Sequence, residues 1–380
     1  MTTTFLLPKD GIFLGRIWRP GIGPAVVTLR GGEVYDITCL EAPTVSALLE
    51  HDDPAGLIAA QPGVPLGPLD AFLTATDDAD ALRLLAPCDL QAVKASGVTF
   101  AASMVERVIE EQAAGDPDKA EAIRARIGST IGASLRGIIP GSDQAATVKD
   151  LLLAEGLWSQ YLEVGIGPDA EIFTKCQPMA AVGWGARVGL HPISRWNNPE
   201  PEIVLAVDSQ GRIRGATLGN DVNLRDVEGR SALLLGKAKD NNASCAIGPF
   251  IRLFDQNYSL DDVRRAELTL HVQGPEGFEM NGASSMAQIS RDPADLVAQL
   301  MGPHHQYPDG AMLFLGTLFA PTQDRGAPGQ GFTHVLGDMV TIAEPMLGSL
   351  SNQVALSTEC PAWRFGAGAL MRNLAGRGLL

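Results

Sequence analysis

Hydrophobic and polar positions alternate with two different periods along this chain, and each period predicts its own kind of element. Over about the first hundred residues, short apolar and β-branched runs are separated by glycine and proline, which favours strands; these runs are GRIWRP, AVVTLR and EVYDIT. Residues 67–85 instead carry apolar residues three and four positions apart, which predicts a helix.

The middle of the chain has the spacing of amphipathic helices. Residues 103–135 predict two helices that are broken at residues 115–117, and residues 149–163 predict a third. Charged residues in these helices recur at positions i and i+4, so we expect them to form solvated faces. The Gly-rich stretch 126–142 lacks the G-x-x-x-x-G-K-[ST] pattern of a phosphate loop, which leaves a helix–loop segment or a lid.

Strand patterns return from about residue 171. Residues 202–208 and 212–219 flank the turn signal Ser209-Gln210-Gly211 and predict a hairpin. Residues 267–274 and 339–345 are strand-like, and residues 292–302 predict a helix with Asp292 as its N-cap. The predicted fold class is therefore mostly β, or α+β, in which a C-terminal β body with covering helices follows a smaller N-terminal domain. The predicted boundaries are 1–95 for the N-terminal accessory domain, 96–164 for a helical connecting segment and 165–380 for the C-terminal domain.

Composition narrows the classes of function. The 380 residues carry a formal net charge of −15 without a run of lysines and arginines, so we expect no nucleic-acid partner. No window approaches the roughly 18 apolar residues of a membrane span, and the N-terminus has no signal-peptide pattern, so we expect no membrane partner and a cytoplasmic location. The five cysteines are widely spaced and form no C-x-x-C pattern, which argues against a disulfide framework or a thiolate zinc site.

Three carboxylates form the candidate chemical centre. Glu200 and Glu202 stand two positions apart at the mouth of a predicted strand, so their side chains share one face. Asp221 lies 19 residues after Glu202, where the predicted hairpin can return it beside the pair. Like charges at this separation repel each other unless a hard cation neutralises them, and Mg²⁺ and Ca²⁺ prefer oxygen ligands. On spacing alone, an E-x-E pair at a strand end is more often just an exposed strand edge.

Residues 199–226, with the sequence PEPEIVLAVDSQGRIRGATLGNDVNLRD, resemble the metal-binding core of the fumarylacetoacetate hydrolase family, in which an E-x-E pair precedes an N-D-x-[ST]-x-R-D segment. Asn223 stands where that family has a hydroxyl residue, and Asn242 stands where an aspartate is expected. Four further segments match in order, over about residues 165–355 in all: AEIFTK, LGKAKDNNASCAIGPFI, AMLFLGTLFAPT and VLGDMVTIAEPMLGSLSNQV.

The resemblance implies a fumarylacetoacetate hydrolase-like catalytic domain, a small-molecule 2-oxo acid as substrate, and a homo-dimer or homo-tetramer. It implies Mg²⁺, with Mn²⁺ or Ca²⁺ as alternatives, at Glu200, Glu202 and Asp221. It also implies that Lys239 acts as a base or anchors the substrate oxyanion, and that Glu171 acts as a second acid/base or as a further metal ligand. We expect burial beside a cation to lower the pKa of Lys239. The remaining residues that it implies bind the substrate, and they are Gly316, Thr317, Arg225 and Lys175.

Two spacings select a branch of this family. Glu171 precedes Glu200 by 29 residues and Lys239 follows Asp221 by 18, which is similar to the 2-keto-3-deoxy-pentonate dehydratases. The predicted reaction removes a C3 proton and the C4 hydroxyl of a xylonate- or arabinonate-derived 2-keto-3-deoxy acid and yields 2,5-dioxopentanoate. One alternative is a fumarylacetoacetase- or acylpyruvase-type C–C hydrolase, which needs a histidine–glutamate pair; His191 is the histidine nearest the metal pair in the sequence. The other alternative is a non-catalytic protein that binds 2-oxo acids.

Overall fold

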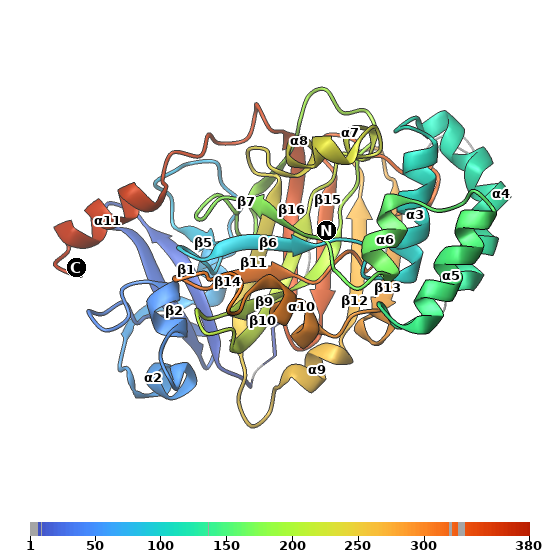
Figure 1. Cartoon of the computed structure of the whole chain (residues 1–380). Helices are drawn as coiled ribbons and strands as arrows, with labels where there is room; N and C mark the ends of the chain where they lie inside the picture. The colour runs from blue at the N-terminus through green and yellow to red at the C-terminus, as the bar shows by residue number, and fades with distance from the viewer. Residues whose placement is uncertain (1–6, 9, 136, 319–320, 326–330) are drawn as a thin grey trace.

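Two β-sheets form the body of the protein (Figure 1). The computed structural model describes residues 7–8, 10–135, 137–318, 321–325 and 331–380, and within these residues one sheet has 11 strands and the other has five. The larger sheet follows the order β4-β3-β2-β1-β11-β10-β9-β14-β6-β7, with β5 paired to β1. Its strands are β1 (Phe13–Arg19), β2 (Gly23–Arg30), β3 (Glu33–Asp36), β4 (Val64–Pro68), β5 (Arg83–Leu85), β6 (Ala92–Ser96), β7 (Ile172–Cys176), β9 (Pro201–Val207), β10 (Ile213–Asp221), β11 (Cys245–Leu253) and β14 (Ala311–Phe314).

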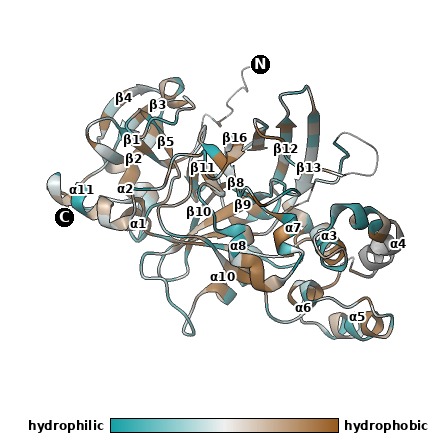
Figure 2. Ribbon diagram, turned by 90° about the horizontal axis from the view of Figure 1, so that it is seen from above, coloured by the Kyte–Doolittle hydropathy of each residue, from teal (hydrophilic) through white to brown (hydrophobic). Residues whose placement is uncertain are grey.

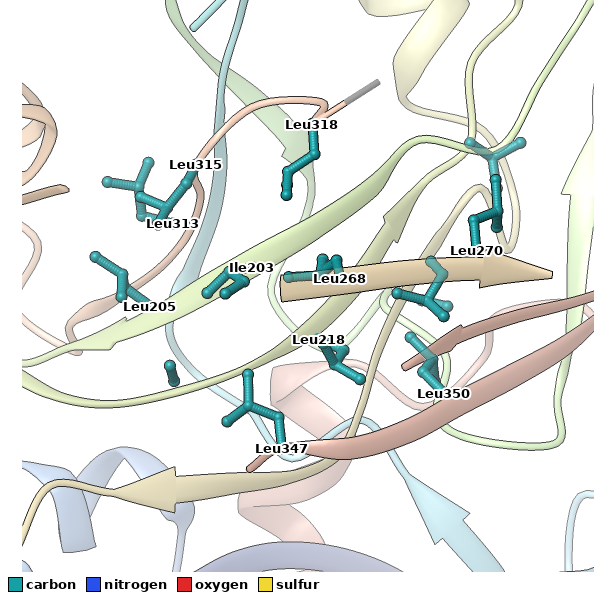
Figure 3. Packing of buried hydrophobic residues seen from close by; sticks show 14 of the residues in the cluster. Ile203, Leu205, Leu218, Leu268, Leu270, Leu313, Leu315, Leu318, Leu347 and Leu350 are labelled. Carbon is teal, nitrogen blue, oxygen red and sulfur yellow. The ribbon is translucent and has the colours of Figure 1, made fainter. Parts of the chain in front are cut away.

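The smaller sheet covers one face of the larger sheet. Its order is β13-β12-β15-β16-β8, and its strands are β8 (Arg187–Leu190), β12 (Glu267–Gln273), β13 (Glu279–Ser285), β15 (Met339–Glu344) and β16 (Gly348–Leu356). Alternation along β9 divides its side chains between two cores. Ile203 and Leu205 pack with Leu268 and Leu350 between the sheets, as Figure 3 shows, whereas Val204 and Ala206 join the core on the opposite face. Because both faces are covered, every residue of β9 and β11 is buried.

The predicted strands and the Asp292 cap are confirmed. The hairpin of β9 and β10 turns at residues 208–212, and the predicted N-terminal runs form β1, β2 and β3. Asp292 accepts a hydrogen bond from the backbone N–H of Ala294 and begins α10 (Pro293–Leu300). The mixed fold, with a C-terminal β body, covering helices and an additional N-terminal sheet region, is also as predicted.

The N-terminal strands extend the larger sheet. Leu14 of β1 pairs with Ile251 of β11, and Val93 of β6 pairs in parallel with Met312 of β14. Figure 2 shows helices at this end of the molecule, namely α1 (Val45–Leu49), α2 (Pro54–Ala60) and α11 (Ala367–Gly376). The predicted boundary near residue 95 thus falls at the end of a strand of the continuous sheet, and the division into three domains stays a prediction.

The helix predicted for residues 67–85 is wrong. Leu69–Phe72 forms one 3-10 turn, and the chain then runs irregularly into β5, where Leu84 pairs with Ile17 of β1. Phe72 of this turn and Leu84 of β5 are buried in one cluster with residues of β1 and β2. The apolar positions that resembled a helix thus belong to two separate elements. Pairing with a distant strand has overridden the local pattern.

Four helices form a separate layer at one end of the molecule, on the right in Figure 1. The two helices predicted for residues 103–135 are confirmed as α3 (Ala101–Gln112) and α4 (Pro117–Leu135). The single helix predicted for residues 149–163 is wrong, because the chain breaks between α5 (Asp143–Ala154) and α6 (Gln160–Ile166), where Ser159 caps the second helix. We refer to α3–α6, residues 101–166, as the helical insertion. None of the described helices is both long and apolar enough to cross a membrane.

Short helices near the ends of β10 and β12 complete the described structure. These are α7 (Arg225–Glu228), α8 (Leu235–Lys239), α9 (Leu260–Arg264) and the 3-10 turns η2 (Ala232–Leu234) and η3 (Met286–Gln288). Both α7 and α8 follow β10 directly, so they stand next to the end of the strand that carries Asp221.

Candidate metal and substrate site

The hairpin of β9 and β10 brings the three predicted carboxylates together. Gly219 is paired with Glu202, and the Asp221 N–H donates to the Glu200 carbonyl oxygen at 3.1 Å. One carboxylate oxygen from each of Glu200, Glu202 and Asp221 lies within 4.8 Å of the others, and each residue is only 1% exposed. The alternative of an exposed strand edge does not describe this arrangement.

The next strand holds Glu202. The Gly316 N–H, just beyond β14, donates to Glu202 Oε2 at 2.7 Å, and the Thr317 hydroxyl donates to Oε1 at 3.3 Å. Gly316 has a φ of +100°, and a Cβ atom there would stand 2.0 Å from Thr99 Oγ1. A glycine is therefore required for this close approach. Burial, with repulsion from Asp221 and Glu200, raises the pKa of Glu202 well above its ordinary value.

Two buried lysines contact the cluster. Lys239 Nζ lies 2.5 Å from Glu200 Oε2 and 3.2 Å from Asp221 Oδ2. Lys175 Nζ lies 2.6 Å from Asp221 Oδ1 and donates to the carbonyl oxygens of Val222 and Lys239. Burial opposes the charge on Asp221, but the two lysines outweigh it and lower the pKa of that carboxyl.

In the absence of a cation, the pKa of Lys239 shifts in the direction opposite to the one expected beside a bound cation, and that expectation stays a prediction. Burial does favour the neutral amine, but attraction to Asp221, Glu200 and Glu228 is stronger and raises the pKa of the ammonium group above its ordinary value. Lys239 is therefore a cation in contact with two of the candidate ligands. Lys175 uses its donors on protein acceptors, and its assignment to substrate binding stays a prediction.

The helical insertion adds charged residues that the sequence analysis missed. Arg107 of α3 donates to Glu200 Oε1, and its other terminal nitrogen lies 2.6 Å from Glu110 Oε2 and 3.1 Å from Glu228 Oε2. Arg107 and Glu110 of α3 are both buried, so the expectation of a solvated charge pair is wrong for these two residues. Glu228 of α7 is buried as well. Burial raises the pKa of Glu228.

Arg225 links the insertion to the end of β10. Its guanidinium lies 2.6 Å from Glu110 Oε1 and 3.0 Å from Glu106 Oε2, and it stacks over the Trp196 ring at 4.5 Å from the centroid. Arg225 is only 1% exposed. The contacts in the structure thus join it to α3, and its predicted role in substrate binding stays a prediction.

Glu171 lies immediately before β7, and its backbone carbonyl oxygen accepts from the Gly97 N–H at 3.1 Å. Burial, reinforced by the negative charge of Glu228, raises the pKa of Glu171 to about 7. Arg107 and Lys239 act in the opposite direction, which places Glu171 within electrostatic reach of both cations. A carboxyl with this pKa exchanges protons readily near neutral pH.

The buried charges fit a divalent cation. Carboxylates outnumber positive groups in the cluster even before Glu171 is counted: Glu110, Glu200, Glu202, Asp221 and Glu228 face Arg107, Lys175, Arg225 and Lys239. The pKa of the Glu202 carboxyl is raised well above its ordinary value, which is expected for a buried carboxylate without sufficient positive charge. An all-oxygen set of three carboxylates suits Mg²⁺, Mn²⁺ or Ca²⁺ and leaves positions for a ligand.

The histidines take other positions. His334 is buried, and its Nδ1 lies 2.8 Å from Asp338 Oδ2, in a network that also contains Arg325. His191 accepts a hydrogen bond from the Ile193 N–H in a partly exposed loop. Within the described part of the chain, neither histidine forms a hydrogen bond or an ion pair with Glu200, Glu202 or Asp221.

The region that contains the three carboxylates is similar to a known protein family. Residues 191–355 match the fumarylacetoacetate (FAA) hydrolase C-terminal family. These residues are therefore similar to the fumarylacetoacetate hydrolase family, as the sequence motifs indicated. A 2-dehydro-3-deoxy-D-arabinonate dehydratase of Saccharolobus solfataricus is 30% identical over 178 residues, which are 45% of this chain and 57% of that protein. A probable 2-keto-3-deoxyxylonate dehydratase of Haloferax volcanii is 29% identical over 194 residues, or 51% of this chain and 63% of that protein.

The similarity in fold to solved structures extends beyond these residues. The solved structure of a 2-keto-3-deoxy-D-arabinonate dehydratase with magnesium and 2,5-dioxopentanoate covers 90% of this chain and 99% of its own, with 20% identity and a TM-score of 0.62. This likeness concerns the fold. The chain matches less than two thirds of the length of both curated relatives.

Proposed function

We propose that this protein is a magnesium-dependent dehydratase of a 2-keto-3-deoxy-pentonate. The buried cluster of Glu200, Glu202 and Asp221 in contact with Lys239 carries the proposal. Two relatives support it, one a 2-dehydro-3-deoxy-D-arabinonate dehydratase and the other a probable 2-keto-3-deoxyxylonate dehydratase. The magnesium and 2,5-dioxopentanoate named with the solved relative are the cation and product that we propose here.

A divalent cation at the three carboxylates would polarise the keto and carboxylate oxygens of a 2-oxo acid and so acidify its C3 hydrogens. Removal of one C3 proton and departure of the C4 hydroxyl as water leave an unsaturated acid. A proton then leaves C5 and one returns to C3, which gives an enol at C4 and C5. Protonation of C4 and loss of the enol hydroxyl proton give 2,5-dioxopentanoate, with the net loss of one water.

The position and charge of each residue suit it to a different part of this reaction. Glu171, with a pKa of about 7, is suited to take a proton from carbon and to return one to the departing hydroxyl. Lys239 is suited to hold a developing oxyanion, because its ammonium already faces the carboxylates at 2.5 and 3.2 Å. Gly316 and Thr317 fix the orientation of Glu202, and we expect them to contact the substrate carboxylate.

A product assay tests the proposal. Purified protein with Mg²⁺ is incubated with 2-keto-3-deoxy-xylonate and with its arabinonate epimer, and proton NMR is used to detect 2,5-dioxopentanoate. Chelator-treated protein serves as the control and should form product only after Mg²⁺ is restored. Cleavage of acylpyruvates with no change in either sugar acid would contradict the proposal and favour a C–C hydrolase. Saturable binding without product from any of these compounds would favour a binding protein.

A further inference from the structure

Both oxygens of the Glu200 carboxylate are already engaged by positive groups. Arg107 of α3 donates to Oε1, and Lys239 of α8 lies 2.5 Å from Oε2. A divalent cation at this carboxylate would stand close to both groups and repel them. Cation binding therefore requires the Glu200 environment to rearrange or to lose positive charge.

Arg107 and Lys239 differ in how they can respond. A lysine ammonium can give up its proton, whereas an arginine guanidinium stays charged at any ordinary pH. Arg107 can only move. It already has further partners, because its second terminal nitrogen lies between Glu110 at 2.6 Å and Glu228 at 3.1 Å. These carboxylates can retain the side chain after its contact with Glu200 is broken.

We propose that Arg107 is an internal counter-ion that competes with the divalent cation for Glu200 and, once displaced, binds the carboxylate of the incoming 2-oxo acid. The inference rests on the proposed cation site and adds a residue from outside the matched family region. Arg107 comes from the helical insertion, 93 positions before Glu200 in the sequence. Its planar fork of donors matches a carboxylate, so the released guanidinium keeps an anionic partner.

The proposal predicts opposite effects on the two ligands. Without the guanidinium, the cation no longer competes for Glu200, so Mg²⁺ should bind more tightly. The 2-oxo acid loses an ion pair, so it should bind more weakly. A residue that only supports the fold would weaken both ligands together or neither, which makes the opposite signs diagnostic.

Isothermal titration calorimetry measures both affinities without turnover. MgCl2 is titrated into chelator-treated wild-type protein and Arg107→Met, and pyruvate is then titrated at saturating Mg²⁺ as the smallest 2-oxo acid probe. Arg107→Met should bind Mg²⁺ about tenfold more tightly and pyruvate about tenfold more weakly, within the usual range of coupling between sites. The matched control is Arg124→Met, which removes a cation from α4 that pairs with Glu106 and Glu121, and it should change neither affinity.

A second pair of measurements covers the case in which Arg107→Met does not fold. Arg107→Lys keeps the positive charge but not the planar guanidinium. The lysine should still compete with Mg²⁺ for Glu200, but pyruvate should bind more weakly because the two-pronged contact is lost. Pyruvate should increase the affinity for Mg²⁺, because linkage between the two ligands is reciprocal. This increase should be larger in the wild-type protein than in either variant.

The outcomes separate this inference from the proposed function. Unchanged affinities in the Arg107 variants, or a parallel loss of both, would overturn the role of Arg107 while the cation site stands. Wild-type protein that binds no Mg²⁺ at all would overturn the cation site itself and the inference with it.

Discussion

Gly97 lies directly against the carboxylate of Glu171. Its N–H donates to the Glu171 carbonyl oxygen at 3.1 Å, and a Cβ atom at position 97 would stand 1.8 Å from Glu171 Oε2. The absence of a side chain at residue 97 therefore determines where this carboxylate can lie.

Gly97→Ala should displace the Glu171 carboxylate and lower turnover. The added methyl group would overlap this carboxylate, so one of the two residues must move. We expect kcat to fall by about tenfold or more, while Mg²⁺ affinity changes little, since Glu171 is not in the carboxylate trio. Steady-state kinetics and calorimetry measure the two quantities. Gly376→Ala in α11 is the control, because its added methyl meets nothing within 4 Å. Normal kcat in Gly97→Ala would contradict a catalytic position for Glu171.

Glu202→Gln should abolish Mg²⁺ retention. The change removes the charge but keeps the shape: the amide oxygen can still accept from the Gly316 N–H, and the amide nitrogen can donate to the Thr317 hydroxyl oxygen. Loss of a direct ligand should exceed the roughly 10–100-fold loss of affinity that follows removal of outer partners of a metal site. Metal content after gel filtration is the measurement, and Glu279→Gln on the exposed edge strand β13 is the control. Full metal content in Glu202→Gln would remove Glu202 from the site.

Lys239→Met should retain Mg²⁺ and lose turnover. Removing this cation leaves Glu200 and Asp221 with less positive charge, so Mg²⁺ should bind at least as tightly as in the wild type. Product formation should fall by about two orders of magnitude or more if the ammonium stabilises an oxyanion. Calorimetry and NMR product assays measure the two effects, with the exposed neighbour Lys237→Met as control. Equal turnover in the two variants would exclude the proposed role.

The pKa of Glu171 predicts a pH dependence of stability. Because this pKa is raised from 4.5 to about 7, the folded protein binds a proton between these values that the unfolded chain has lost. The contribution of Glu171 to stability is therefore present below pH 4.5 and declines as the pH rises to about 7. Glu171→Gln should be increasingly more stable than the wild type across this window and then differ by a constant amount. Thermal unfolding from pH 4.5 to 8 measures it; a difference that is constant throughout would contradict the raised pKa.

The carboxylate trio could be predicted because its geometry is local. A tight turn between two strands fixes the register, so alternation places Glu202 and Asp221 on one face near the same sheet end. Arg107 was not predictable in this way. Its charge pairs have the spacing of a solvated helix, and only the packing of α3 against residues 93 positions away makes them buried.

The same distinction explains the errors in secondary structure. Leu84 belongs to a strand because it pairs with Ile17, a contact that the local pattern of residues 67–85 does not contain. The break before α6 depends on Ser159, whose hydroxyl accepts from the Tyr161 N–H and also donates to Glu111 of α3. Contacts between distant segments decided both cases.

The helical insertion leaves the larger sheet from β6 and re-enters it at β7, and these two strands are antiparallel neighbours, with Ser96 paired with Ile172. The whole excursion thus replaces the loop of a β-hairpin. Its length and composition can drift during evolution, or be exchanged by design, without changing the order of any strand. Since Arg107 arrives on this excursion while Glu200, Glu202 and Asp221 belong to the hairpin of β9 and β10, new ligand preferences can arise by grafting a different loop onto an unaltered metal-binding frame.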